Sequence, residues 1–296
     1  RSTISADLNI AEDPYFKLRF HSNISRKFKY GTDISIISLF MNQYDDKVIN
    51  NSYSIQDNKL DLFAELMPTI EQQFRLGAAI DYIHLRDNLI YVGPNSDYDF
   101  ITYAYLNYHL NNEDSPTYAS RGWKLNVNGK YIVPFIKQRD GSKTGNSIVV
   151  RADMEGSIAM GKRHTMKLGA TFGTSLNGNE PPLNYLFFVG GQSHMKYFDN
   201  IISFDGLKFT QLYGDHIALA KLSWQYNIYN NIYAIANVNG GYVTRSYDDW
   251  FTDDSFVFGC GLTFGFNTMA GPIEVSFMGS NRCSTPIGFL NIGYWF

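Results

Sequence analysis

The sequence lacks three features that would assign it to a familiar class: a long apolar run, a set of cysteines and an excess of positive charge. No apolar run approaches the ~20 residues of a membrane-spanning helix, so a helical membrane protein is excluded. Cys260 and Cys283 are too few for a disulfide framework, and we expect both thiols to be free. The net charge of −3 gives no electrostatic basis for binding nucleic acid, so that partner is excluded.

Motifs for catalysis and cofactor binding are also scarce. The nucleophile elbow of a serine hydrolase needs Gly-x-Ser-x-Gly, but the nearest match, residues 173–177, closes on Asn177. Gly259, Gly261 and Gly265 lack the following helix that a dinucleotide site requires. The sequence therefore predicts no catalytic residue and no cofactor in this chain.

Metal binding and surface catalysis have little support. The two cysteines do not form a ligand pair, and none of the six histidines has metal-site spacing. We therefore predict no metal. The six histidines are His21, His84, His109, His164, His194 and His216.

An enzyme built into a membrane-embedded wall would have to rely on Ser193, His194 and His216.

What the sequence does contain is aromatic residues in strand-like alternation. Aromatic residues make up 16% of the chain, and Phe and Tyr far outnumber Trp. In the stretch 255–296 large apolar residues alternate with small or polar ones, a period of two that indicates strands. An aromatic face opposite a face of Gly, Thr, Ser and Asn is typical of a transmembrane β-barrel. The first strand of this stretch sets Phe256, Phe258, Cys260, Leu262, Phe264 and Phe266 against Val257, Gly259, Gly261, Thr263 and Gly265.

The same alternation along the whole chain predicts an all-β protein, a single antiparallel barrel domain over residues 1–296. We count about 14 strands, with 12 or 16 as alternatives, and an even count places both ends on one side. A long segment, 177–213, precedes the last five strands. Residues 45–57 and 111–120 are predicted to be loops, and short turns are predicted at 26–31, 68–72, 161–164, 229–231 and 268–271.

The two faces of the predicted strands have different environments. Residues expected to face lipid are Leu222, Trp224, Tyr226, Phe258, Leu262 and Phe264. Charged residues expected in the lumen are Lys124, Lys130, Arg151, Asp153, Glu155, Lys167 and Lys221. Because opposite charges inside a narrow barrel usually neutralise one another, we favour a structural role for this set over ion conduction.

The C-terminal motifs resemble those of a known superfamily. Asn291-Ile292-Gly293, followed by Tyr294 and the terminal Phe296, looks like the assembly signal of outer-membrane barrels. The stretch 271–275, Gly-Pro-Ile-Glu-Val, resembles the start of the penultimate strand in the bacterial surface-antigen superfamily, which includes barrel-assembly and two-partner secretion proteins. In most members an inward-folded loop carries Val-Arg-Gly-Phe or Val-Arg-Gly-Tyr. The corresponding residues here are Phe204, Asp205, Gly206 and Leu207, with Asp205 in place of the arginine.

One branch of that superfamily is most similar. Gly190-Gly191, Tyr197-Phe198, the stretch 202–207 and the ending Gly-Tyr-Trp-Phe are similar to the C-terminal barrel of bacterial patatin-like phospholipases, best over residues 165–296. The resemblance implies the outer membrane of a Gram-negative bacterium, contact with its lipids and with the barrel assembly machinery, and N-terminal lipase or periplasmic domains in a longer protein. This chain would be the non-catalytic anchor, and a candidate translocation domain, for the lipase module. An assembly or secretion barrel and a passive porin are the alternatives.

The long segment 177–213 is predicted to fold inward. Its apolar run, 185–189, would be an association hazard on an exposed loop. Asp205 would then enter the lumen, where an isolated charge is costly. We expect it to pair with Arg151, Lys167 or Lys221, or with backbone donors.

Deleting Phe296 tests the assembly signal. If the terminal aromatic is read during insertion, the deletion lowers the amount of folded, heat-modifiable protein recovered from the outer membrane. The measurement is the shifted band on unheated gels, compared with total protein. An unchanged folded fraction would count against the signal.

Overall fold

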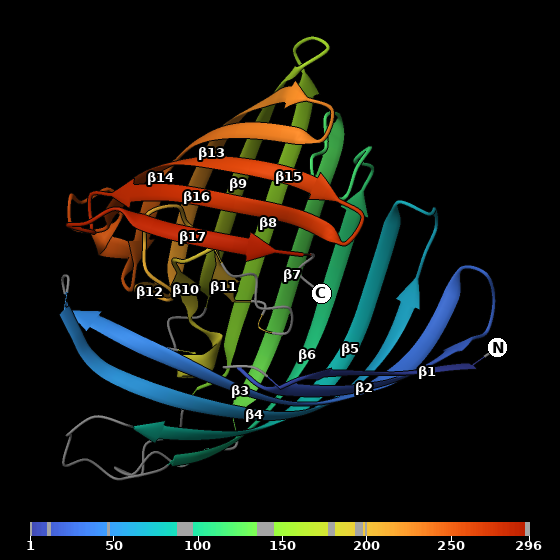
Figure 1. Cartoon of the computed structure of the whole chain (residues 1–296). Coiled ribbons are helices and arrows are strands. Elements are labelled where there is room, and N and C mark those ends of the chain that lie inside the picture. The colour runs from blue at the N-terminus through green and yellow to red at the C-terminus, as the bar shows by residue number, and fades with distance from the viewer. Residues whose placement is uncertain are drawn as a thin grey trace.

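The computed structural model describes residues 2–10, 13–45, 48–87, 97–134, 145–176, 181–192, 198 and 200–293. Fourteen strands form one antiparallel sheet in chain order, interrupted only by three short strands, β10 to β12, that form a separate sheet. The large sheet curves around a central space in which the small sheet lies (Figure 1). The all-β fold and the count of 14 strands are therefore confirmed.

The strand bounds follow the predicted alternation closely. The large sheet comprises β1 (Ser2–Asn9), β2 (Tyr15–Asn23), β3 (Phe28–Asp45), β4 (Val48–Leu66), β5 (Gln72–Asp87), β6 (Asp97–Asn111), β7 (Gly122–Pro134), β8 (Ser147–Ala159), β9 (His164–Leu176), β13 (His216–Tyr229), β14 (Ile232–Thr244), β15 (Phe256–Thr268), β16 (Gly271–Ser280) and β17 (Ile287–Ile292).

Two boundary predictions near the N-terminus were wrong. Tyr30 and Gly31 do not form a turn, because both lie in β3 and pair with residues of β4. The turn lies at 24–27. The predicted loop 45–57 is largely strand β4. At 18 and 19 residues, β3 and β4 exceed the ~9–11 residues that a strand needs to cross a bilayer, so their polar ends pair beyond it. The alternation is weak in β3 because Ile37 and its inward neighbours pack against apolar residues in the enclosed space.

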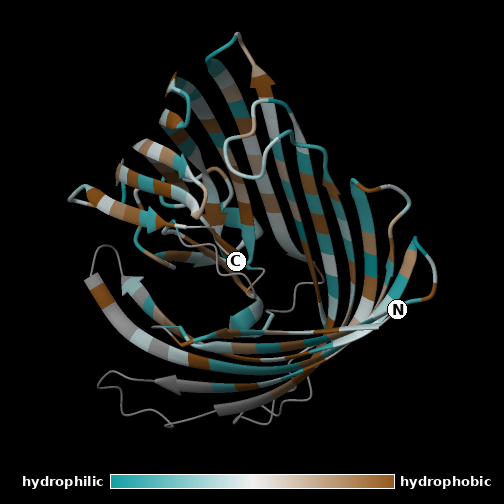
Figure 2. Ribbon diagram, turned by 45° about the vertical axis from the view of Figure 1, so that its right-hand side comes forward, coloured by the Kyte–Doolittle hydropathy of each residue, from teal (hydrophilic) through white to brown (hydrophobic). Residues whose placement is uncertain are grey.

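Outward positions of the strands carry large exposed apolar side chains. Leu222, Trp224 and Phe264 are 45%, 48% and 47% exposed, as expected for a lipid-facing belt. Figure 2 shows the resulting bands of hydrophobic and hydrophilic residues along each strand. Phe258 and Leu262 are likewise exposed, whereas Tyr226 is only partly exposed.

The connections divide into two rims. The short-turn rim holds both described ends of the chain, because Ser2 pairs with Ser22 and Ile292 with Ile273. Its connections are 24–27, 67–71, 112–121, 160–163, 230–231 and 269–270. The long-loop rim includes the connection after β9 and the segment 245–255 between β14 and β15. Apart from 112–121, the connections at the short-turn rim are short, as the sequence predicts.

The expected closure of the barrel is not observed. Within the described residues no pairing joins β1 to β17, so the sheet is open along a seam between its first and last strands (Figure 1). Strand β17 has only six residues and pairs with β16 alone. Both strands therefore have an edge that this sheet does not pair.

No helix in the described part of the chain is long and apolar enough to cross a membrane.

The connection between β9 and β13 folds into the enclosed space. We call its described residues, 181–192, 198 and 200–215, the inserted segment. It contains η1 (Leu183–Tyr185), β10 (Phe187–Val189), β11 (Ile201–Ile202) and β12 (Leu212–Gly214), in the sheet order β11-β10-β12. Its side chains pack against apolar inner residues of the wall. This core includes Phe187, Phe188, Val189, Phe204 and Leu207 of the segment and Ile37, Leu39, Ile55, Ile101, Ile132 and Ile217 of the wall.

A charge placed on the outer face should destabilise the protein. Leu168 of β9 is 44% exposed on that face, while the neighbouring Lys167 lies on the inner face. Leu168→Arg should lower the free energy of unfolding by about 2–4 kcal/mol, because the charge enters the apolar part of the bilayer. Urea unfolding in lipid vesicles measures the change, with Lys167→Arg as the matched control. Equal effects of the two substitutions would contradict the assignment of faces.

Candidate functional site in the lumen

Asp205 lies at the tip of the inserted segment and is completely buried, with 0% exposure of its side chain. A backbone bridge between Gly191 and Phe204 holds the preceding residues, and Gly206 adopts φ +86°, so the chain turns sharply at this tip. The Lys221 ammonium of β13 lies 2.9 Å from Asp205 Oδ2. Of the three cations expected as partners, Lys221 is therefore the one that pairs.

Further contacts fix the Asp205 backbone against β14 and β15. In the amide orientation that satisfies both partners, Asn239 Oδ1 accepts from the Asp205 N–H and Nδ2 donates to the Gly259 carbonyl, each at 2.7 Å. The Gln192 side chain donates to Asp205 Oδ1. A Cβ at Gly259 would collide with the Asp205 carbonyl, so this wall position has to be glycine.

The next residue, Gly206, is held by β16. Ser280 Oγ donates to the Gly206 carbonyl at 2.7 Å. A Cβ at Gly206 would collide with the Gly279 backbone, and its positive φ disfavours any side chain. The segment tip therefore packs backbone against backbone on the wall.

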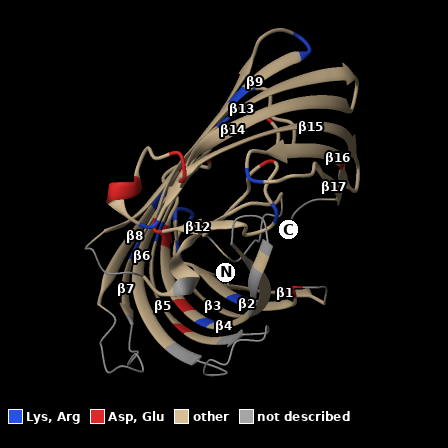
Figure 3. Cartoon of the chain, turned by 90° about the vertical axis from the view of Figure 1, so that its left-hand side faces the viewer, with Lys and Arg blue, Asp and Glu red and all other residues tan. Residues whose placement is uncertain are grey.

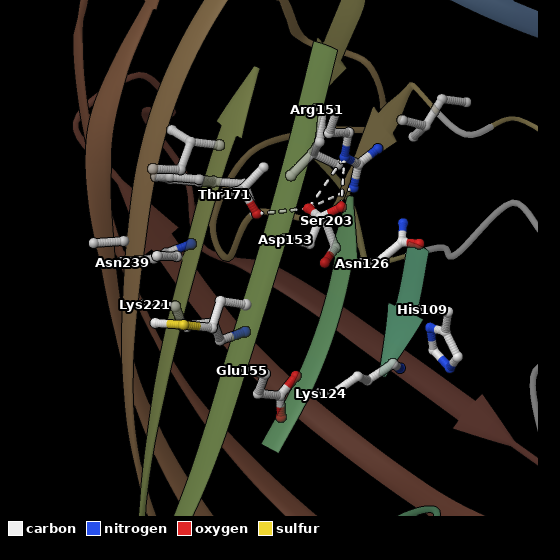
Figure 4. A pocket seen from close by; sticks show the side chains of 18 residues that line it. His109, Lys124, Asn126, Arg151, Asp153, Glu155, Thr171, Ser203, Lys221 and Asn239 are labelled. Carbon is white, nitrogen blue, oxygen red and sulfur yellow. Dashed lines mark hydrogen bonds and ion pairs between the residues drawn. The ribbon is translucent and has the colours of Figure 1, made fainter. Parts of the chain in front are cut away.

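Four of the other predicted lumen charges form ion pairs with one another. Arg151 Nε lies 2.8 Å from Asp153 Oδ2, and Thr171 Oγ1 donates to the same carboxylate at 2.9 Å (Figure 4). Lys167 lies 3.8 Å from Glu155. These residues, apart from Lys167, line a cavity of about 490 Å³ that also contains Lys124 and Lys221. Lys130 lies apart from this set, with its ammonium 5.5 Å from the Tyr103 ring and 5.6 Å from the Tyr185 ring.

A second charged cluster, which we did not predict, covers the inner face of β2 to β6. Its centre is Arg75, whose guanidinium lies 2.6 Å from Asp61, 3.2 Å from Asp33 and 3.5 Å from Glu65. It also donates to Tyr105 Oη at 2.7 Å. Figure 3 shows acidic and basic bands side by side on these strands. The signal was present in the sequence, because the charged residues of β4 alternate with leucines as the predicted lumen charges do.

A tyrosine of the inserted segment contacts the edge of this cluster. Tyr185 Oη donates to Asp81 at 2.5 Å, and Lys59 lies 3.6 Å from both Asp81 and Asp57. Burial, followed by the nearby Asp81 carboxylate, raises the pKa of Tyr185 well above its usual range. Tyr185 therefore remains protonated and acts as the donor. The inserted segment is thus attached to the wall at β5 as well as at β13.

The loop 112–121 folds inward at the opposite rim. Tyr118 Oη donates to Glu274 Oε1 at 2.8 Å, and its ring stacks on Tyr233 with centroids 4.1 Å apart. Gly265 leaves the space that the Tyr118 ring occupies. Burial, and then Glu274, raises the pKa of Tyr118 above its usual range, so the phenol stays protonated.

Glu274 also contacts the proposed assembly signal. Asn291 points inward and donates to Glu274 Oε2 at 3.1 Å, whereas Ile292 is 71% exposed on the outer face. The Gly293 N–H donates to the Pro272 carbonyl at 2.8 Å. Tyr294 and Phe296 lie outside the described residues.

The candidates for surface catalysis are not assembled into a site. Ser193 and His194 lie outside the described residues. His216 Nδ1 lies 2.9 Å from Thr174 Oγ1, and the Tyr247 ring covers the imidazole at 3.9 Å between centroids. Over the described residues, no group of three or more His, Cys, Asp or Glu side chains could hold a metal ion.

Removing the buried carboxylate should destabilise the protein. Breaking a buried pair typically costs about 3–5 kcal/mol, and we expect Asp205→Ala at or below the low end because the Lys221 side chain is 37% exposed. The matched control is Glu155→Ala, whose carboxylate is 47% exposed and should cost at most ~1 kcal/mol. Urea unfolding in lipid vesicles measures both. An Asp205→Ala variant as stable as the parent would show that the pair does not hold the segment.

Comparisons with known proteins agree with this architecture. A family model described as the OMP85 superfamily matches residues 9–296. Haemophilus ducreyi BamA lacking POTRA domains 1–3 superposes with a TM-score of 0.71, at 13% identity over 98% of this chain and 64% of that one. CdiB from Escherichia coli gives 0.52, at 12% identity over 95% and 53%. CdiB from Acinetobacter baumannii gives 0.58, at 10% identity over 98% and 49%.

These structural likenesses are too distant in sequence to show more than the fold. The chain spans less than two thirds of the length of each of these three structures. No curated protein is significantly similar to it in sequence. The family match, however, covers nearly the whole chain. The chain therefore belongs to the OMP85 superfamily and is a β-sheet protein of the Gram-negative outer membrane.

Proposed function

We propose that this chain is a membrane anchor with an obstructed lumen, which holds an N-terminal patatin-like phospholipase module of the same protein at the outer membrane. The lipase assignment is supported by motifs similar to those of patatin-like barrels, including Gly190-Gly191 and Phe204-Asp205-Gly206-Leu207. The chain itself contributes attachment and no catalytic step.

The observation that carries the anchor role is the way the inserted segment is held. Asp205 is fully buried against Lys221, and Tyr185 is bonded to Asp81 on the other side. Expelling the segment would break both contacts and expose its apolar core to water. Each buried side chain such as Phe187 or Phe204 stabilises the inserted state by about 1.5–3 kcal/mol. Such a lumen suits a fixed support better than a passive pore.

A second candidate, an assembly or secretion barrel, is favoured by the open seam. The edges of β1 and β17 are not paired to each other in the described residues. An unpaired strand edge is a ready template for another extended chain. Membership of the superfamily supports this reading too, whereas the replacement of the family's lumen arginine by Asp205 argues against it.

The two candidates predict different modules in the full protein. With a lipase module, the native protein reacts with a fluorophosphonate probe at a serine N-terminal to Arg1, and limited proteolysis separates the label from the heat-modifiable barrel. The matched control is the same protein with that serine replaced by alanine. The assembly barrel would be favoured by two results: repeated small periplasmic domains in place of a labelled module, and a fall in the amount of other outer-membrane barrels when this protein is depleted. Together they would rule out the anchor proposal.

A further inference from the structure

The connection between β14 and β15, residues 245–255, folds over the outside of the wall. We call it the outer loop. The Tyr247 ring packs on His216, which occupies an outward position because the next residue, Ile217, is in the core. The Phe251 ring meets the outward Tyr242 edge-on, with centroids 5.0 Å apart. In Figure 3 the acidic turn η2 (Tyr247–Asp249) stands outside the sheet, away from the enclosed space.

Hydrogen bonds make the outer loop a defined structure. Ser246 Oγ accepts from the Asp248 N–H at 3.3 Å and caps η2. Ser255 Oγ donates to the Asp249 carbonyl at 2.8 Å, and the Val243 N–H donates to the Ser255 carbonyl at 3.0 Å. The loop is also tied to the β16–β17 connection, where the Arg282 guanidinium donates to the Asp254 and Phe256 carbonyls. The direction in which the aromatic rings point is therefore set by the loop itself.

Phe251 combines a strained backbone with an exposed aromatic side chain. Its φ of 63° lies in the left-handed region, which is uncommon for a residue with a bulky side chain. Its side chain is nevertheless 77% exposed. Strain of this kind persists only where the surroundings enforce it and points to a use for the residue. Contact with an apolar phase would account for the exposed ring.

The adjoining surface identifies that phase. Trp250 lies next to Phe251, with ring centroids 6.0 Å apart, and Phe256 lies beside Tyr242 at 5.4 Å. From Phe256 the exposed apolar face continues along β15 through Phe258, Leu262 and Phe264. The aromatic group is thus continuous with the lipid-facing belt, at the long-loop rim. Trp and Tyr are enriched where a membrane protein meets the bilayer interface.

We propose that the outer loop is a bilayer-insertion site. Phe251 and Trp250 enter the lipid beside the outer face of β13 to β15, and the exposed carboxylates of the loop remain at the level of the headgroups. The four carboxylates are those of Asp248, Asp249, Asp253 and Asp254. This contact fixes the depth and tilt of the C-terminal strands in the bilayer at the long-loop rim. The proposal rests on the membrane location of the family and is independent of any attached lipase.

Tryptophan fluorescence tests the insertion. Trp123, Trp224 and Trp295 are replaced by Phe so that Trp250 is the only emitter, and the protein is folded into phosphatidylcholine vesicles with or without brominated acyl chains. The expected result is a loss of Trp250 emission in brominated vesicles with little quenching by aqueous acrylamide. Phe251→Ser should reverse the pattern while leaving the heat-modifiable fold intact. Acrylamide quenching without any effect of bromine would overturn the proposal.

A second measurement does not depend on the triple tryptophan replacement. Phe251→Cys is made in a Cys260→Ser, Cys283→Ser background and labelled with a membrane-impermeant maleimide. Labelling should be complete in denaturant and largely lost after reconstitution into the same vesicles, whereas Asp253→Cys should label in both states. Equal labelling of the two cysteines in vesicles would overturn the proposal. So would protection of Phe251→Cys that appears only as the protein concentration rises, because a second copy of the chain would then be the occupant.

Discussion

A carboxylate enclosed away from water requires a countercharge, and much of the lumen is arranged around meeting that requirement at Asp205. Lys221 supplies the charge from β13, and Gln192 donates a hydrogen bond to the carboxylate. Asn239 accepts a hydrogen bond from the Asp205 backbone N–H. For the carboxylate to reach Lys221, the backbone of the inserted segment has to lie in contact with the backbone of the wall. This close contact explains Gly259 and Gly206, because a side chain at either position would collide with the facing backbone. One ion pair therefore accounts for the depth of the segment and for the glycines around it.

The rest of the lumen divides into three zones. Towards the long-loop rim the inner face of the wall is apolar, and Ile37, Leu39 and other inner residues pack against the inserted segment. Further along the strands, charges on β2 to β6 gather around Arg75. At the short-turn rim the loop 112–121 folds inward and Tyr118 donates a hydrogen bond to Glu274. Glu274 also accepts a hydrogen bond from Asn291 of the last strand. Outside the wall, the outer loop turns its aromatic rings the opposite way, towards lipid.

Alternation predicted most of the fold because lipid and lumen impose opposite demands on neighbouring residues. It identified all fourteen strands but misplaced the ends of β3 and β4, where inner residues are also apolar or the strands continue beyond the bilayer. Lys221 could be named as a partner of Asp205, but choosing it over Arg151 and Lys167 required the fold, because both of those pair with neighbouring carboxylates. The alternation in β4 also predicts charged residues on the inner face, but the Arg75 cluster was not among the predicted sites. The contact of Tyr118 with Glu274 joins residues 156 positions apart, and no local pattern predicts it.

The Asp205–Lys221 pair keeps the inserted segment in place and the lumen obstructed. Single-channel recording in planar bilayers measures this obstruction in the parent, in Lys221→Ala and in the charge swap Asp205→Lys with Lys221→Asp. We expect no steady conductance from the parent, opening bursts from Lys221→Ala as the segment loosens, and substantial closure by the swap. Steady conduction by the parent, with the same current as Lys221→Ala, would show that the pair does not obstruct the lumen.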